Sequence, residues 1–120
     1  MALLSLVPTS PGISIFQGEG QAINFTCNNS AGSPVTMSGL NAYRIKIFNP
    51  SGSGSASPMF SDTTTGNFTG SSGALLYTLS AAHATAMQPG SWSYVVECQN
   101  GSGDDFQQVA AGTVTVRVAA

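Results

Sequence analysis

The chain has 120 residues, a length that suits one domain with a sizeable core. Only 7% of its residues are charged, against about 25% in an average soluble domain. The three basic residues, Arg44, Lys46 and Arg117, are too few to neutralise a phosphate backbone, so the composition excludes nucleic acid as an expected partner.

The N-terminal segment MALLSLVP is apolar but does not fit a secretory signal peptide, because its apolar run is short and no basic residue precedes it. We therefore expect it to be retained and the protein to be made without export. No apolar run approaches the length of a transmembrane helix, so we expect no membrane partner.

We divide the chain into an N-terminal arm, residues 1–11, and a single domain, residues 12–120. The arm is expected to dock either on its own domain or on a neighbouring protein, and both alternatives stay open. Its candidate docking residues are Leu3, Leu4, Leu6 and Val7.

Three segments in the first half of the chain alternate with a period of two, which is typical of half-buried β-strands. They are residues 12–17, residues 21–28 (QAINFTCN) and residues 41–48 (NAYRIKIF). In the third segment the pattern places Arg44 and Lys46 in water. The side chains predicted to face inward are Ile23, Phe25, Cys27, Tyr43, Ile45 and Ile47.

Residues 49–73 give the weakest pattern, because they are rich in Gly and Ser. Short strands are expected near Phe60, at a sheet edge, and near Phe68. Because an exposed sheet edge can accept another chain, Met59 and Phe60 are candidate docking residues. Equally, these two side chains could cover the end of their own core.

Residues 74–80 return to strand alternation, with Leu75, Tyr77 and Leu79 inward. The Ala-rich residues 81–87 follow Ser80, a suitable N-cap, and predict one helical turn.

Residues 87–98, MQPGSWSYVVEC, carry the strongest strand pattern in the chain. After the Pro-Gly corner, Trp92, Tyr94, Val96 and Cys98 share one heavy apolar face. We expect this strand to be central and to pack against an opposite sheet.

In the last strand Val114, Val116 and Val118 share a face, whereas Val109 has the opposite parity. This change of parity predicts a β-bulge near residues 110–112.

Each predicted strand has one apolar face, and two sheets packed face to face can bury all of these faces. We predict an all-β fold, an antiparallel β-sandwich of about seven strands with one short helical turn before the penultimate core strand. The side chains expected to anchor its core are Phe25, Ile45, Tyr77, Trp92 and Tyr94.

The two cysteines, Cys27 and Cys98, both have inward parity, on the second and penultimate strands. Immunoglobulin domains place their inter-sheet cysteine pair in this way, so we expect an immunoglobulin-like sandwich with the two side chains facing each other. A disulfide and a pair of buried thiols both remain open.

Several stretches resemble a known group of domains in their order along the chain. These are FQGEGQAINFTC, MSGLNAYRIKIFNPSG, GALLYTLSAAHATAMQPGSWSYVVEC and GTVTVRV, which span residues 16–118. They are similar to the immunoglobulin-like domains of tailed-bacteriophage virion accessory proteins, including the N-terminal domain of baseplate upper proteins. The resemblance implies a virion role in anchoring, decorating or joining particle parts. The chain departs from that group in its low charge, and from antibody domains in the position of its one Trp.

Catalytic chemistry and metal binding have little support in the sequence. His83 is the only histidine, and no nucleophile and acid accompany it in a triad pattern, so we expect an exposed or capping role. Asp104 and Asp105 suggest a calcium site, but only Asp62 and Glu97 could complete it, so we expect a solvated turn instead. We predict no catalytic residue, no metal and no cofactor.

These observations together predict a non-enzymatic structural or accessory protein of a bacteriophage virion, made in the host cytoplasm, that decorates or reinforces the capsid. Its expected partners are other virion proteins and further copies of itself. The alternatives are a tail or baseplate adaptor, and a carbohydrate- or receptor-binding β-sandwich.

Overall fold

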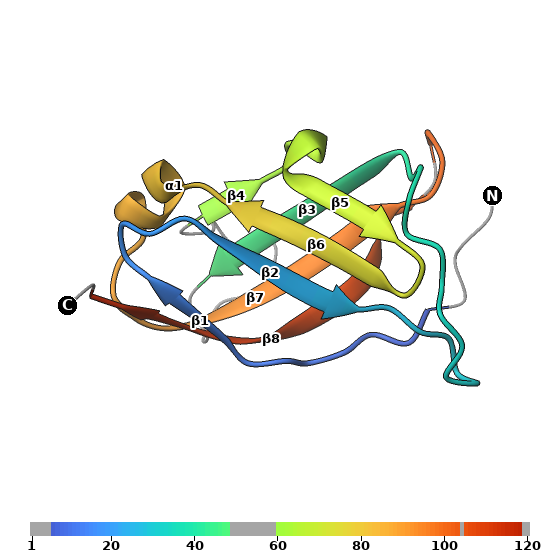
Figure 1. The fold of residues 1–120 in the computed structure, drawn as a ribbon, viewed down its shortest axis with the longest axis horizontal. Helices are drawn as coiled ribbons and strands as arrows, with labels where there is room; N and C mark the ends of the chain where they lie inside the picture. The colour runs from blue at the N-terminus through green and yellow to red at the C-terminus, as the bar shows by residue number, and fades with distance from the viewer. Residues whose placement is uncertain (1–5, 49–59, 104, 119–120) are drawn as a thin grey trace.

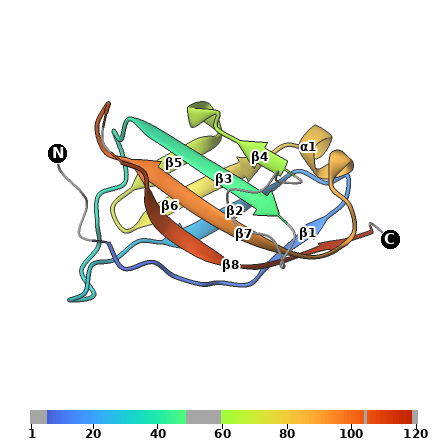
Figure 2. The ribbon, with the colours of Figure 1, turned by 180° about the vertical axis from the view of Figure 1, so that it is seen from behind.

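The computed structural model describes residues 6–48, 60–103 and 105–118, and these residues form a β-sandwich of two sheets. The larger sheet has the strand order β1-β8-β7-β3-β4, and the smaller has the order β2-β6-β5. Figure 1 shows the smaller sheet in front, and Figure 2 shows the larger sheet from its outer side. The strands are β1 (Ile13–Phe16), β2 (Gln21–Thr26), β3 (Ala42–Phe48), β4 (Phe60–Asp62), β5 (Phe68–Ser71), β6 (Ala74–Leu79), β7 (Gly90–Gln99) and β8 (Gln107–Arg117).

The predicted all-β sandwich is confirmed, with eight strands in the described residues where the sequence predicted about seven. The weakly patterned segment supplies β4 and β5, close to the two short strands expected there. A single 3₁₀ turn, Thr65–Asn67, joins them. β7, predicted to be central, is the middle strand of the larger sheet.

One strand pair departs from the predicted antiparallel arrangement. β1 pairs with β8 in parallel, with Ile13 opposite Val114 and Phe16 opposite Arg117. The chain already runs beside β8 in this direction before β1 begins, because Thr9 forms a parallel bridge with Ala110. The local alternation of β1 predicts a strand but contains no information about the direction of its partner.

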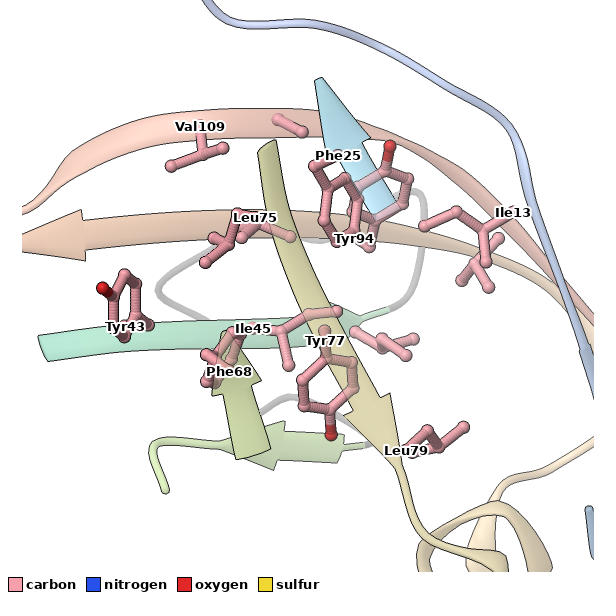
Figure 3. Packing of buried hydrophobic residues seen from close by; sticks show 14 of the residues in the cluster. Ile13, Phe25, Tyr43, Ile45, Phe68, Leu75, Tyr77, Leu79, Tyr94 and Val109 are labelled. Atoms are coloured by element: carbon pink, nitrogen blue, oxygen red, sulfur yellow. The ribbon is translucent and has the colours of Figure 1, made fainter. Parts of the chain in front are cut away.

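The core lies between the two sheets (Figure 3). Phe25 of β2 meets Tyr94 of β7 with ring centroids 6.0 Å apart, so the apolar face of β7 packs against the opposite sheet, as predicted. Phe68 lies between two further rings, 5.5 Å from Tyr43 and 4.8 Å from Tyr77. Of the five predicted anchors, Phe25, Ile45, Tyr77 and Tyr94 are fully buried.

The fifth predicted anchor, Trp92, packs against the core from its margin and is only partly buried. Its indole N–H donates to the carbonyl oxygen of Gln88 at 3.0 Å. An indole needs such a partner, and the connection before β7 provides one at the end of the sandwich. Val118, predicted to face inward, lies beyond the end of β8 and is 67% exposed.

The predicted helical turn is present as α1 (Ala81–Ala86), which carries the chain from the smaller sheet to the larger one (Figure 1). The backbone N–H of His83 donates to the Ser80 side chain at 3.2 Å, which confirms Ser80 as the N-cap.

The predicted β-bulge is present, centred one residue before the predicted range. Val96 pairs with Ala110, but the next residue, Glu97, pairs with Gln108. Val109 is therefore the extra residue, and both Val109 and Ala110 are buried. The bulge resolves the change of parity in the last strand.

Candidate interaction surfaces

The two cysteine thiols lie in the core and are free. Cys27 directly follows β2 and Cys98 lies in β7, so they come from opposite sheets, and both are fully buried. Burial raises the pKa of each thiol to about 11, and the charge of Cys27 adds to the shift of Cys98. The prediction of two inward, neighbouring cysteines therefore agrees with the structure, in which they are unbonded. Protonated, buried thiols are poor nucleophiles and poor metal ligands.

The described part of the N-terminal arm docks on its own sandwich. The Val7 N–H donates to the Asn28 carbonyl at 2.9 Å, at the end of the smaller sheet. The Thr9 N–H donates to the Val109 carbonyl at 3.2 Å, on the larger sheet. Leu6 packs against the core and Val7 is 46% exposed. Of the four predicted docking residues in the arm, Leu3 and Leu4 lie outside the described residues.

At the opposite edge, Phe60 covers the end of its own core. Its ring packs edge-on against the His83 ring, with centroids 5.1 Å apart, and the side chain is partly buried. This contact agrees with the core-covering alternative for Phe60. For His83 the sequence predicted an exposed or capping role, and the structure shows a partly buried side chain that packs against Phe60. Met59 lies outside the described residues.

The outer face of the larger sheet carries a hollow of about 430 Å³. A row of paired residues crosses three strands there: Lys46 of β3 is opposite Val95 of β7, and Val95 is opposite Ala111 of β8. The surface of the hollow contains apolar, polar and charged side chains. The residues lining the hollow are Lys46, Phe48, Tyr94, Val95, Glu97, Gln108 and Ala111.

A charged pair fixes one side of this hollow. The Arg44 Nε donates to the Glu97 carboxylate at 2.7 Å, and both side chains are about a quarter exposed (27% and 22%). The guanidinium also lies over the Phe106 ring, 3.7 Å from its centroid. Arg44 is therefore held in place rather than fully solvated as the sequence predicted, while Lys46 lines the hollow.

Two of the four acidic residues considered for calcium, Glu97 and Asp62, are engaged elsewhere. Glu97 pairs with Arg44, and Asp62 is 4% exposed and accepts three hydrogen bonds. These come from the Tyr77 hydroxyl at 2.7 Å, the Asn67 amide at 2.9 Å and the Thr64 N–H at 2.9 Å. Within the described ranges, no three His, Cys, Asp or Glu side chains are grouped so that they could hold a metal ion. Asp104 lies outside those ranges.

The hollow is the feature that sequence reasoning missed, although part of its signal was present. Phe48 has the same parity as Arg44 and Lys46, which the alternation of β3 places outside. Val95 has the parity opposite to Tyr94. The outward positions of these two apolar side chains could therefore be predicted from the sequence. That both line one hollow could not, because it depends on the order of the strands in the sheet.

Two comparisons with known proteins identify no related protein or family. A scan against protein-family models finds no match to the chain, and a search of curated proteins finds none. In the part of the chain that the structure describes, no helix is both long enough and apolar enough to cross a membrane.

Proposed function

We propose that the chain is a non-enzymatic accessory module of a bacteriophage virion that docks on other virion proteins, most directly on the capsid surface. In this proposal it is made in the host cytoplasm and carried on the particle. The virion context comes from the resemblance, whose most specific stretch corresponds to β6, α1 and β7.

The hollow on the larger sheet is the observation that supports docking. Phe48, Val95 and Ala111 offer apolar contact on this sheet face, and Lys46, Glu97 and Gln108 add polar groups to the same hollow. Protein–protein interfaces commonly combine apolar contacts with polar groups that form hydrogen bonds. The strands beneath are fixed by the core, so the surface is organised before a partner arrives.

Co-sedimentation with purified phage shells, and separately with purified tails, tests this function. We expect the chain to pellet with shells, and Val95→Asp to weaken this binding by about tenfold or more, because it buries a carboxylate in the contact. Ser91→Asp is the matched control, since Ser91 is exposed and has the same outward parity on β7. Both variants should unfold at the wild-type temperature within a few degrees.

Binding to tails instead of shells would support the adaptor alternative within the same proposal. Failure to bind either particle would contradict the virion role. Equal binding by wild type and Val95→Asp would move the docking surface away from the hollow.

A carbohydrate-binding function is the second candidate, and the position of Phe48 favours it. Sequence parity placed most aromatic side chains inside, but Phe48 lines the hollow together with polar side chains, among them Lys46 on the same strand. A sugar ring can stack on such an aromatic face while its hydroxyls bond to polar neighbours. On a glycan panel this alternative predicts binding that Phe48→Ala abolishes, with no binding to shells.

A further inference from the structure

The outer edge of β2 is an open strand edge in the described structure. β2 is at the end of the smaller sheet and pairs only with β6. Its start is held by Gln21, whose side-chain amide donates to the Ser14 carbonyl at 2.7 Å. Just beyond its end, Asn28 accepts from Val7. Between these points, among the described residues, the outward backbone groups of Ala22–Thr26 have no backbone partner.

The other three sheet edges are shorter or covered. β4 has three residues and β1 has four. β5 has four, and the backbone of Met37 lies against it, since the Met37 N–H donates to the Ser71 carbonyl at 3.0 Å. β2 has six residues, QAINFT, with no charge and no proline. Natural edge strands usually carry charged residues or proline, which prevent pairing with another chain, and β2 has neither.

Charge is distributed unevenly between the two faces of the sandwich. β2, β5 and β6 contain no charged residue, whereas all three basic residues belong to β3 and β8. Ala22, Asn24 and Thr26 point to the solvent side of β2 and are exposed. A second copy of this face can therefore approach without like-charge repulsion.

We propose that two copies of the chain pair antiparallel through β2 about a two-fold axis at Asn24, which joins two three-stranded sheets into one of six strands. Directly opposed residues in an antiparallel pair must face the same side of the sheet. With Asn24 opposite itself, Ala22 lies opposite Thr26 on the outer side, and Ile23 lies opposite Phe25 on the core side. The paired segment then coincides with the open part of the edge.

Two side chains favour this register. The amide of Asn24 is both donor and acceptor, so the two copies of Asn24 can bond across the axis. Ile23 has core-facing parity but is only partly buried, and a neighbouring strand would cover it. A symmetric dimer also needs one self-complementary patch only. This inference is independent of the virion proposal, because it concerns the purified chain alone.

Sedimentation of the purified chain over a wide concentration range tests the dimer. We expect a species of twice the 12.2 kDa chain mass that dissociates on dilution. Asn24→Lys should weaken association by about tenfold or more, because it places two ammonium groups opposite each other. Thr69→Lys is the matched control: Thr69 is exposed in the same row of the sheet, at the far edge, since both residues pair with Leu76.

A cysteine pair provides a second readout that does not depend on the charged variant folding. Under a mild oxidant, Asn24→Cys should form a cross-linked dimer, whereas Thr69→Cys should stay monomeric on a non-reducing gel. A chain that is monomeric at every concentration overturns the proposal. So does a dimer that Asn24→Lys leaves intact, or cross-linking that is equal at both positions. Failure of these tests leaves particle binding unaffected, so the two proposals fail separately.

Discussion

At Gly70 a strand and a loop approach each other closely. A Cβ atom at this position would lie 2.0 Å from the carbonyl oxygen of Met37. That carbonyl cannot move freely, because it accepts a hydrogen bond from the buried hydroxyl of Tyr43. The Met37 side chain is also fully buried. The small residue here is required by packing, not by turn geometry.

We therefore expect Gly70→Ala to lower the free energy of unfolding by about 2–3 kcal/mol, through forced displacement of the Met37 loop. Urea unfolding followed by fluorescence measures the change. Gly12→Ala is the control, since a Cβ there meets nothing within 4 Å, and it should change stability by no more than about 1 kcal/mol. An unchanged midpoint for Gly70→Ala would contradict the close approach.

Residue positions were predictable where the signal was local. The alternation of NAYRIKIF predicted that Tyr43, Ile45 and Ile47 are buried, and they are. The contact between Gly70 and Met37 was not predictable, because the two residues lie in separate segments whose meeting depends on the whole sheet arrangement. Trp92 had the right parity but lies near the end of the strand, where parity no longer ensures burial.

At the scale of elements, one buried hydrogen bond joins the two layers of the sandwich. Asp62 belongs to β4 of the larger sheet, and Tyr77, which donates to it, belongs to β6 of the smaller one. Burial alone would raise the pKa of Asp62, but hydrogen bonds from Thr64, Tyr77 and Asn67 hold that pKa below its ordinary value of 3.8. The ionised carboxylate is therefore stabilised by the fold.

This pKa shift predicts a pH-dependent contribution to stability. A carboxyl group with a lowered pKa in the folded state stabilises the fold at pH values above its unfolded pKa, and this contribution disappears as the pH falls through the folded value. At pH 7 we expect Asp62→Asn to be less stable than the wild type by about 1–3 kcal/mol. The difference should shrink below pH 3.8, where the unfolded-state carboxyl protonates.

Urea titrations of both proteins between pH 7 and pH 2.5 measure this difference. Asp105→Asn is a suitable control, because Asp105 is exposed. A stability difference that stays constant over the whole range would show that the charge of Asp62 does not contribute.

Elements with strong alternation were predicted from the sequence, and pairings were not. The strands of the first half, β6, β7 and the capped turn all lie close to their predicted positions. The parallel pairing of β1 with β8 was missed, because the direction of a partner depends on a connection of 90 residues, 17–106. The link between Asp62 and Tyr77 was missed because it joins strands of different sheets, although each side chain was considered separately.

At the scale of the whole molecule, the two thiols report on separation of the sheets. Cys27 and Cys98 are fully enclosed between the layers, and burial raises the pKa of each to about 11. We expect neither thiol to react at pH 8 within minutes with an aromatic disulfide reagent, and both to react at once in denaturant. The labelling rate in low denaturant should follow the opening of the whole sandwich.

Ser91→Cys supplies the control for this labelling, because an exposed thiol on the same strand as Cys98 should react rapidly in the folded protein. Rapid labelling of the native cysteines in the wild type would contradict their enclosure. The inward parity of both cysteines was predicted from sequence, while their unbonded state was left open, since parity carries no information about bonding.

The parallel pairing of the first and last strands has a consequence for protein engineering. Residues 9–16 run parallel to β8, from the bridge between Thr9 and Ala110 to the pairing of Phe16 with Arg117, so the described chain starts at one end of a body 42 Å long and ends at the other (Figure 1). A fluorescent reporter fused after β8 and an affinity tag fused before the N-terminal arm would therefore project from opposite ends. Tandem copies joined by short linkers would therefore form an extended linear array, with each domain following the previous one end to end.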